Sequence, residues 1–232
     1  MGKKIIAFGM GALMALAFSG GAVPAEAGIR HSPHDLSSSA EHTGIKSTDL
    51  NDLCVFCHTP HAASTSVNNA PLWNRTVPAE LSIAQLYDSG SLSSVSKPSV
   101  VLDVVNNSDA RLCLSCHDGA SLTGALINPN VAPAGLVNIT GGGNLFDGGN
   151  FLTNDHPIGM SYAAAEAAKP GGFIAAGSIG LRLFQFVPEG VGDTITDAMW
   201  CASCHNVHNN EHGNFLAKSN AGSVLCLTCH IK

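Results

Sequence analysis

Residues 54–58 read Cys54-Val-Phe-Cys57-His58, which is two cysteines separated by two residues and followed at once by a histidine. This C-x-x-C-H pattern is the attachment signature of haem c. The two thiols add to two vinyl groups of one porphyrin, and the histidine becomes the proximal ligand of the iron. The pattern recurs further along the chain as Cys113-Leu-Ser-Cys116-His117, Cys201-Ala-Ser-Cys204-His205 and Cys226-Leu-Thr-Cys229-His230.

The four motifs use all 8 cysteines of the chain, so the sequence predicts four haem c groups and their irons as cofactors. Two other uses of cysteine fit less well. Structural zinc sites contain C-x-x-C pairs, but zinc does not require a histidine directly after every second cysteine. Disulfides are common in secreted proteins, but they would leave the four histidines without a role.

The sixth coordination position of a haem iron decides between electron transfer and ligand chemistry. Only two methionines, Met160 and Met199, follow the N-terminal segment, so methionine cannot be the general sixth ligand. We expect imidazole on both faces of all four irons, which leaves no open position for substrate and favours electron transfer over catalysis. The histidines outside the motifs, out of 11 in total, are His31, His34, His42, His61, His156, His208 and His212.

Spacing suggests which of these serve. His61 and His208 each lie three residues after a proximal histidine, so we expect each to reach a haem other than that of its own motif. His156 lies in a turn where Asp155 or a backbone carbonyl could orient its ring.

The N-terminal histidines are harder to assign. His34 begins a predicted helix and is a candidate ligand, while the role of His31 stays open. His42 and His212 are predicted not to be ligands.

Residues 1–27 have the pattern of a secretory signal, with Lys3 and Lys4, an apolar run over 5–18 and Ala-Glu-Ala at 25–27. The apolar run is too short to cross a bilayer, and we expect no membrane span elsewhere. Residues 28–232 are therefore predicted to be a secreted tetrahaem cytochrome c domain, which is extracellular or on the cell surface, with the periplasm as the alternative. The net charge of −6 argues against a nucleic-acid partner.

The composition predicts a mostly irregular fold with short α-helices and very few strands, organised around a contiguous chain of haems. Aromatic residues make up only 6% of the chain, so we expect the porphyrins to supply apolar volume. Each motif should form one or two helical turns, and residues 119–150 should be irregular loop. Other expected elements are helices at 35–39, 79–87 and 161–169 and strands at 100–105 and 181–187.

Several stretches resemble multihaem c-type cytochromes of the doubled-CXXCH type, and among these the tetrahaem cytochromes that form extracellular nanowires in metal-reducing bacteria. The resemblance covers most of residues 28–232. It is carried by SPHDLS from Ser32, CVFCHTPH from Cys54, PLWNR from Pro71, CLSCHDG from Cys113, HPIG from His156, and the closing CASCHNVH and CLTCH.

This resemblance implies distal ligands at His34, His61, His156 and His208. It also implies a homopolymer in which a histidine of one subunit ligates a haem of the next, with the N-terminal arm carrying His31 and His34 as the expected donor. The expected partners are upstream cytochromes as electron donors and extracellular acceptors such as metal oxides.

Three other functions compete with this electron-transfer protein, which we do not expect to be an enzyme. The first is a monomeric periplasmic shuttle. The second is a multihaem reductase, which would need one haem with an open position and acid or base groups nearby. The third is a surface protein whose haems only support folding.

Overall fold

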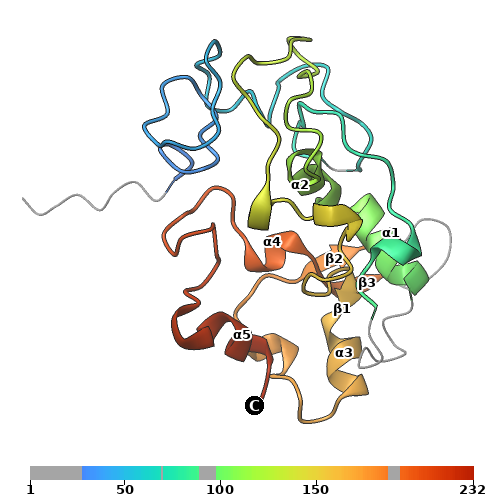
Figure 1. Ribbon diagram of the computed structural model, residues 1–232. Helices are drawn as coiled ribbons and strands as arrows, with labels where there is room; N and C mark the ends of the chain where they lie inside the picture. Colours follow the sequence, from blue (N-terminus) through green and yellow to red (C-terminus); the bar gives the residue numbers. More distant parts are fainter. Residues whose placement is uncertain (1–27, 69, 89–97, 188–193) are drawn as a thin grey trace, which may run out of the picture.

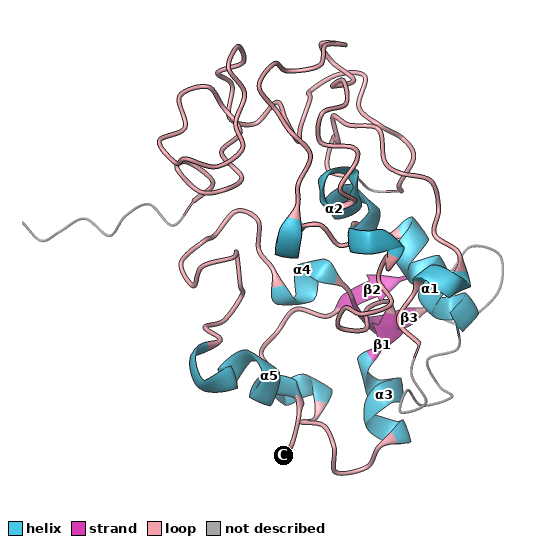
Figure 2. Cartoon of the chain, in the orientation of Figure 1, coloured by secondary structure: helices cyan, strands magenta, loops and turns pink. Residues whose placement is uncertain are grey.

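The computed structural model describes residues 28–68, 70–88, 98–187 and 194–232 (Figure 1). Irregular loops connect short helices and one small sheet, as Figure 2 shows, so the predicted fold class is confirmed. The helices of the described residues are α1 (Pro98–Asn107), α2 (Ala110–His117), α3 (Tyr162–Ala168), α4 (Cys201–Cys204) and α5 (Val224–Cys229). Single 3-10 turns lie at Ile83–Gln85, Gly141–Gly143, Asp147–Gly149, Ala176–Ser178 and Ala221–Ser223.

The predicted signal segment, residues 1–27, lies outside the described residues. Within the described ranges, no helix has both the length and the apolar character needed to cross a membrane.

The sheet holds β1 (Met160–Ser161), β2 (Phe184–Phe186) and β3 (Ile195–Met199) in the order β1-β3-β2, with both pairings antiparallel. β3 runs directly into the third C-x-x-C-H motif. Trp200, between the strand and α4, stacks on Phe184 with ring centroids 4.3 Å apart. The largest hydrophobic cluster therefore anchors this motif to the sheet and to α1 and α2.

The predicted strand at 100–105 is wrong, because this segment forms part of α1. Val101, Leu102, Val104 and Val105 recur at helical spacing, and Val104 and Val105 are fully buried against the largest cluster. β-Branched residues lower helix propensity only slightly, so burial of one apolar face outweighs it.

The helices expected at 35–39 and 79–87 are also wrong, since only the turn Ile83–Gln85 forms. Asp35 bonds through its carboxylate to the backbone N–H of Ser37 at 3.2 Å and of His31 at 2.8 Å, which favours a turn over a helix. Leu81 is held in place by both polar atoms of the buried Asn106 side chain on α1.

The remaining elements agree with the sequence. The helix expected at 161–169 is confirmed as α3, and the Ser161 side chain caps it by accepting a hydrogen bond from the N–H of Ala164 at 3.1 Å. The strand expected at 181–187 is confirmed as the shorter β2, and 119–150 is irregular apart from two 3-10 turns.

Gly159 lets the chain pass close to α1. Its φ is +86°, and a Cβ at this position would lie 2.7 Å from the carbonyl oxygen of Val101. Only glycine fits both the left-handed backbone and the close approach. Its N–H also donates to the carbonyl of Met199 at 2.6 Å, which joins the turn after His156 to the end of β3.

Replacing Gly159 with alanine should therefore destabilise the haem-loaded protein by about 1–3 kcal/mol. The measurement is denaturant unfolding followed by far-ultraviolet circular dichroism. Gly177→Ala is the matched control, because beyond its two chain neighbours no atom lies within 4 Å of its added Cβ. Equal midpoints for the two variants would contradict this account of Gly159.

Candidate haem attachment sites

Each C-x-x-C-H motif closes one helical turn. The backbone N–H of His58 donates to the carbonyl of Cys54 at 2.8 Å, and the same bond joins His205 to Cys201 and His230 to Cys226 at 2.9 Å. Residues three and four apart share a helix face, so both thiols and the imidazole of a motif point to one side. The second to fourth motifs lie in α2, α4 and α5, and the first is a single turn, as the sequence predicts.

Backbone carbonyls fix the tautomer of three proximal histidines. The Nδ1 atom lies 2.6 Å from the carbonyl oxygen of Pro71 in His58, 2.7 Å from that of Gly143 in His117, and 2.9 Å from that of Asn214 in His205. A carbonyl only accepts, so Nδ1 carries the proton and donates. Nε2 keeps its lone pair, which is the arrangement found in metal-binding histidines.

His230 of the fourth motif is positioned differently. Its ring lies against Phe173, with centroids 5.0 Å apart, and the backbones of the two residues form an isolated β-bridge. These carbonyls and aromatic rings are functional contacts that sequence reasoning missed. A backbone carbonyl has no sequence signature, so no pattern in the chain could have identified the first three.

Three proximal histidines each face a second histidine, and the distance between the two rings is nearly the same in all three pairs. Ring centroids are 6.0 Å apart in the pair His34–His117, and 6.2 Å apart in both His58–His208 and His156–His230. A metal bonded to both rings at about 2.0 Å, with about 1.1 Å from nitrogen to centroid, requires centroids about 6 Å apart. The residues present therefore fit an iron between the rings of each pair.

Each pair joins separate parts of the chain. The N-terminal arm supplies His34 to the second motif, and the segment after the third motif supplies His208 to the first. His208 thus faces a motif other than its own. The interplanar angle is 15° for His58–His208, compared with 64° and 63° for the pairs that contain His34 and His156.

His34 is the most enclosed of the candidate distal ligands. Its ring stacks on Phe215 with centroids 4.1 Å apart and an interplanar angle of 14°. Burial, followed by the nearby His117, His205 and His208, lowers the pKa of His34 to about 4. The ring is therefore neutral at physiological pH, which is the form that binds a metal.

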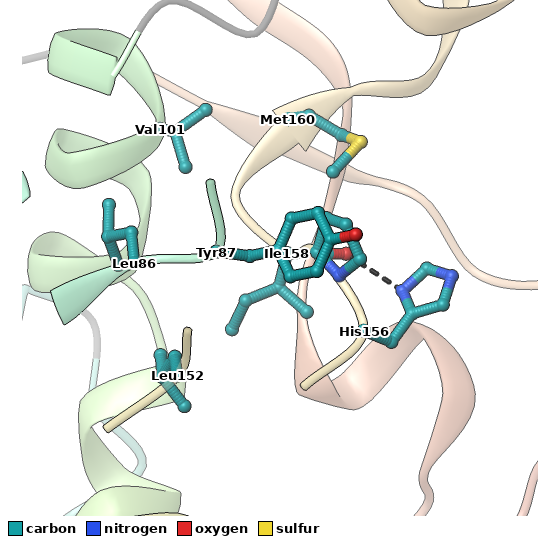
Figure 3. A pocket seen from close by; sticks show the side chains of 8 residues that line it. Leu86, Tyr87, Val101, Leu152, His156, Ile158 and Met160 are labelled. Carbon is teal, nitrogen blue, oxygen red and sulfur yellow. Dashed lines mark hydrogen bonds between the residues drawn. The ribbon is translucent and has the colours of Figure 1, made fainter. Parts of the chain in front are cut away.

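His156 is oriented by a backbone carbonyl. Its Nδ1 lies 2.9 Å from the carbonyl oxygen of Pro157, so this carbonyl, rather than Asp155, holds the ring. His156 is one of the residues that line a small, mostly apolar pocket (Figure 3), together with Leu86, Tyr87, Val101, Leu152, Ile158 and Met160.

Two histidines remain apart. Among the described residues, no imidazole faces His205, and no other ring contacts the exposed His61. His61 and His205, which the sequence predicts as iron ligands, are thus the two that the structure does not pair.

The three other histidines differ in their surroundings. Both ring nitrogens of His42 bond to the backbone, with Nε2 2.8 Å from the carbonyl oxygen of Asp35 and Nδ1 accepting from the N–H of Gly44 at 3.0 Å. Both nitrogens of His42 are therefore engaged in stabilising the backbone of the N-terminal arm. His31 lies 3.8 Å from the Glu41 carboxylate, and His212 is exposed.

Motifs that are consecutive in the sequence have attachment cysteines that lie near one another in space. Burial and then the neighbouring Cys116 raise the pKa of Cys57 to about 12, which links the first and second motifs. A hydrogen bond with Cys201, followed by burial, raises the pKa of Cys113 well above its usual value, which links the second and third.

The third and fourth motifs are linked in the same way, since burial and then Cys229 raise the pKa of Cys204 to about 11. Figure 1 shows α2, α4 and α5 succeeding one another through the molecule, and α2 contacts α4. The four motifs therefore form one row rather than separate sites.

The described residues contain no group of three or more His, Cys, Asp or Glu side chains placed to hold a metal ion by themselves. All eight cysteines are free thiols in the structure. Pairs of imidazoles beside thiol pairs suit a metal that brings its own four equatorial nitrogens, as haem iron does.

Comparison with models of protein families identifies part of the chain. Residues 194–232, which contain the third and fourth motifs, match the family model described as the doubled CXXCH motif (Paired_CXXCH_1), a pattern of multihaem c-type cytochromes. The match is narrower than the resemblance found in the sequence, which extends over most of residues 28–232. A search of curated proteins found none that matches the chain.

Removing one distal imidazole should open one iron of the four. His156→Ala is expected to convert one haem to the high-spin ferric form in electron paramagnetic resonance and to let one reduced haem bind carbon monoxide. His42→Ala is the matched control, because both of its nitrogens serve the backbone. If the His156 variant keeps four haems and all of them stay low-spin, His156 is not a ligand.

Proposed function

We propose that this multihaem c-type cytochrome is a secreted electron carrier with four bis-histidine haems, and that it polymerises into an extracellular filament. The filament would take electrons from upstream cytochromes and deliver them to external acceptors such as metal oxides. The observation that carries electron transfer is the row of adjacent motifs, which Cys57 and Cys116, Cys113 and Cys201, and Cys204 and Cys229 link in turn.

The chain's own residues serve this role by holding the irons still and close together. Each haem, when attached, supplies one-electron exchange between ferric and ferrous iron. Imidazole on both faces keeps the coordination unchanged between these two forms, so little rearrangement opposes the transfer. Attachment sites this close together would bring neighbouring porphyrin edges close, and electron tunnelling falls steeply with distance.

The surroundings of His61 and His205 are the observations that favour assembly between copies of the chain. The backbone at His61 is fixed, because its carbonyl accepts from the Thr59 hydroxyl at 2.8 Å and from the Asn128 amide at 3.1 Å, while the residue itself is exposed. His205 has an oriented ring and no facing imidazole among the described residues. We assign His61 of one copy as the sixth ligand of the iron on His205 in the next.

This assignment replaces the N-terminal arm as the donor. His34 lies opposite His117 of its own chain, so it is already engaged within the subunit. His31, the other expected donor in the N-terminal arm, lies near Glu41 instead.

A reductase is the second candidate, and His205 is again the observation that favours it. A proximal histidine without a facing imidazole is also what an open catalytic haem would show. In a reductase the iron on His205 would be high-spin in the wild type and would bind carbon monoxide. A monomeric periplasmic shuttle would instead appear as discrete particles in the microscope.

The variant His61→Ala tests the filament. The wild type should form filaments in negative-stain electron microscopy, with all irons low-spin. His61→Ala should give discrete particles with one high-spin haem per chain. The control is His212→Ala, which removes another exposed imidazole and should leave both filaments and spin state unchanged.

Two results would contradict the assignment. Wild-type protein with one high-spin haem, unchanged by His61→Ala, would indicate the reductase. Discrete wild-type particles with four low-spin haems would indicate the shuttle.

A further inference from the structure

The segment that follows the first motif ties this motif to the second. The Trp73 indole N–H donates to the hydroxyl of Ser115, inside the second motif, at 3.2 Å. Asn74 donates to the first motif twice, from its backbone N–H to the carbonyl of Cys57 at 2.9 Å and from its side-chain amide to that of Val55 at 2.6 Å. Whatever follows Asn74 is therefore held at the junction of the two attachment sites.

The next residue, Arg75, carries a positive charge into this junction. It is only 2% exposed. Its Nη2 donates to the carbonyl of Ser121 at 3.0 Å and to that of Leu122 at 2.6 Å. Cys57 and Cys116 both pack against the hydrophobic cluster that contains Leu122, so the guanidinium is held next to a cluster that the two motifs share.

The electrostatics of the two thiols agree with this placement. Burial raises the pKa of Cys57 and of Cys116, and the Arg75 cation opposes the rise at both. Together with the bonds of Arg75 to Ser121 and Leu122, this places the charge near both attachment sites.

No carboxylate within the described ranges neutralises this cation. The Arg75 Nη1 is buried without a hydrogen-bond partner, and none of the carboxylates in the described residues forms an ion pair with it. Its known partners, the carbonyls of Ser121 and Leu122, carry no net charge. An uncompensated charge in a poorly solvated interior acts more strongly on its neighbours than the same charge in water.

We propose that Arg75 is a fixed positive charge that raises the reduction potentials of the first and second haems. A haem that gains an electron loses one unit of positive charge, so a nearby cation stabilises the reduced form relative to the oxidised form. Electrons entering the row would then favour the end that contains these two haems. The inference rests on the proposed function, because it requires haems attached at both motifs.

The test is a spectroelectrochemical titration of the full haem-loaded protein. Arg75→Gln should lower the midpoint potentials of two of the four haems, by about tenfold in each one-electron equilibrium constant, or about 59 mV. Arg75→Lys keeps the charge but loses the guanidinium that bonds to the two carbonyls, and its midpoint potentials should stay close to those of the wild type. Arg30→Gln removes the same charge from an exposed side chain, where solvent and salt screen it, and should change nothing.

The outcomes separate the possible explanations. If Arg75→Gln and the wild type titrate identically with four haems each, the inference is wrong. If the midpoint potentials of Arg75→Lys with four haems shift downward, the hydrogen bonds of the guanidinium and not its charge are responsible. This result also overturns the inference, and it can be obtained even if Arg75→Gln does not mature. Failure of the proposed function is distinguishable, because it would show in the wild type itself, as missing haem in the intact mass, as a high-spin iron or as discrete particles.

Discussion

The separation of 6.0–6.2 Å between facing imidazole rings, repeated at three of the four motifs, is the constraint on which the rest of the structure depends. Secondary structure alone could not hold these segments in place. α4 and α5 are too short to be stable on their own, and α5 buries none of its residues. Each facing pair joins segments far apart in sequence. Bonds from both rings to one metal would therefore hold long loops closed, which the small hydrophobic clusters could not do alone.

The sequence predicted what local chemistry determines. The four motifs were expected as helical turns, and the short Cys-x-x-Cys-His spacing allows little else. The helix at 161–169 was predictable because Pro170-Gly171-Gly172 ends it, and in the structure Ser161 caps its start. The segment 100–105 was misjudged because its valines suggested a strand, whereas the positions of Val104 and Val105 on one helix face decided the outcome.

The pairing of ligands could not be predicted, because it depends on contacts between distant segments. Spacing indicated that His208 leaves its own motif, but not that it faces His58. Likewise, nothing local distinguishes His61 from His208, since each follows a proximal histidine by three residues. Their different surroundings come from the tertiary fold, as do the carbonyls of Pro71, Gly143 and Asn214 that fix the proximal rings.

The central claim is that a porphyrin is joined to each thiol pair, and intact-mass spectrometry of protein purified from its native host tests it most directly. The account predicts the mass of residues 28–232 plus four haems, together with a strong Soret band. A mass equal to the bare polypeptide, with no Soret absorption, would contradict it.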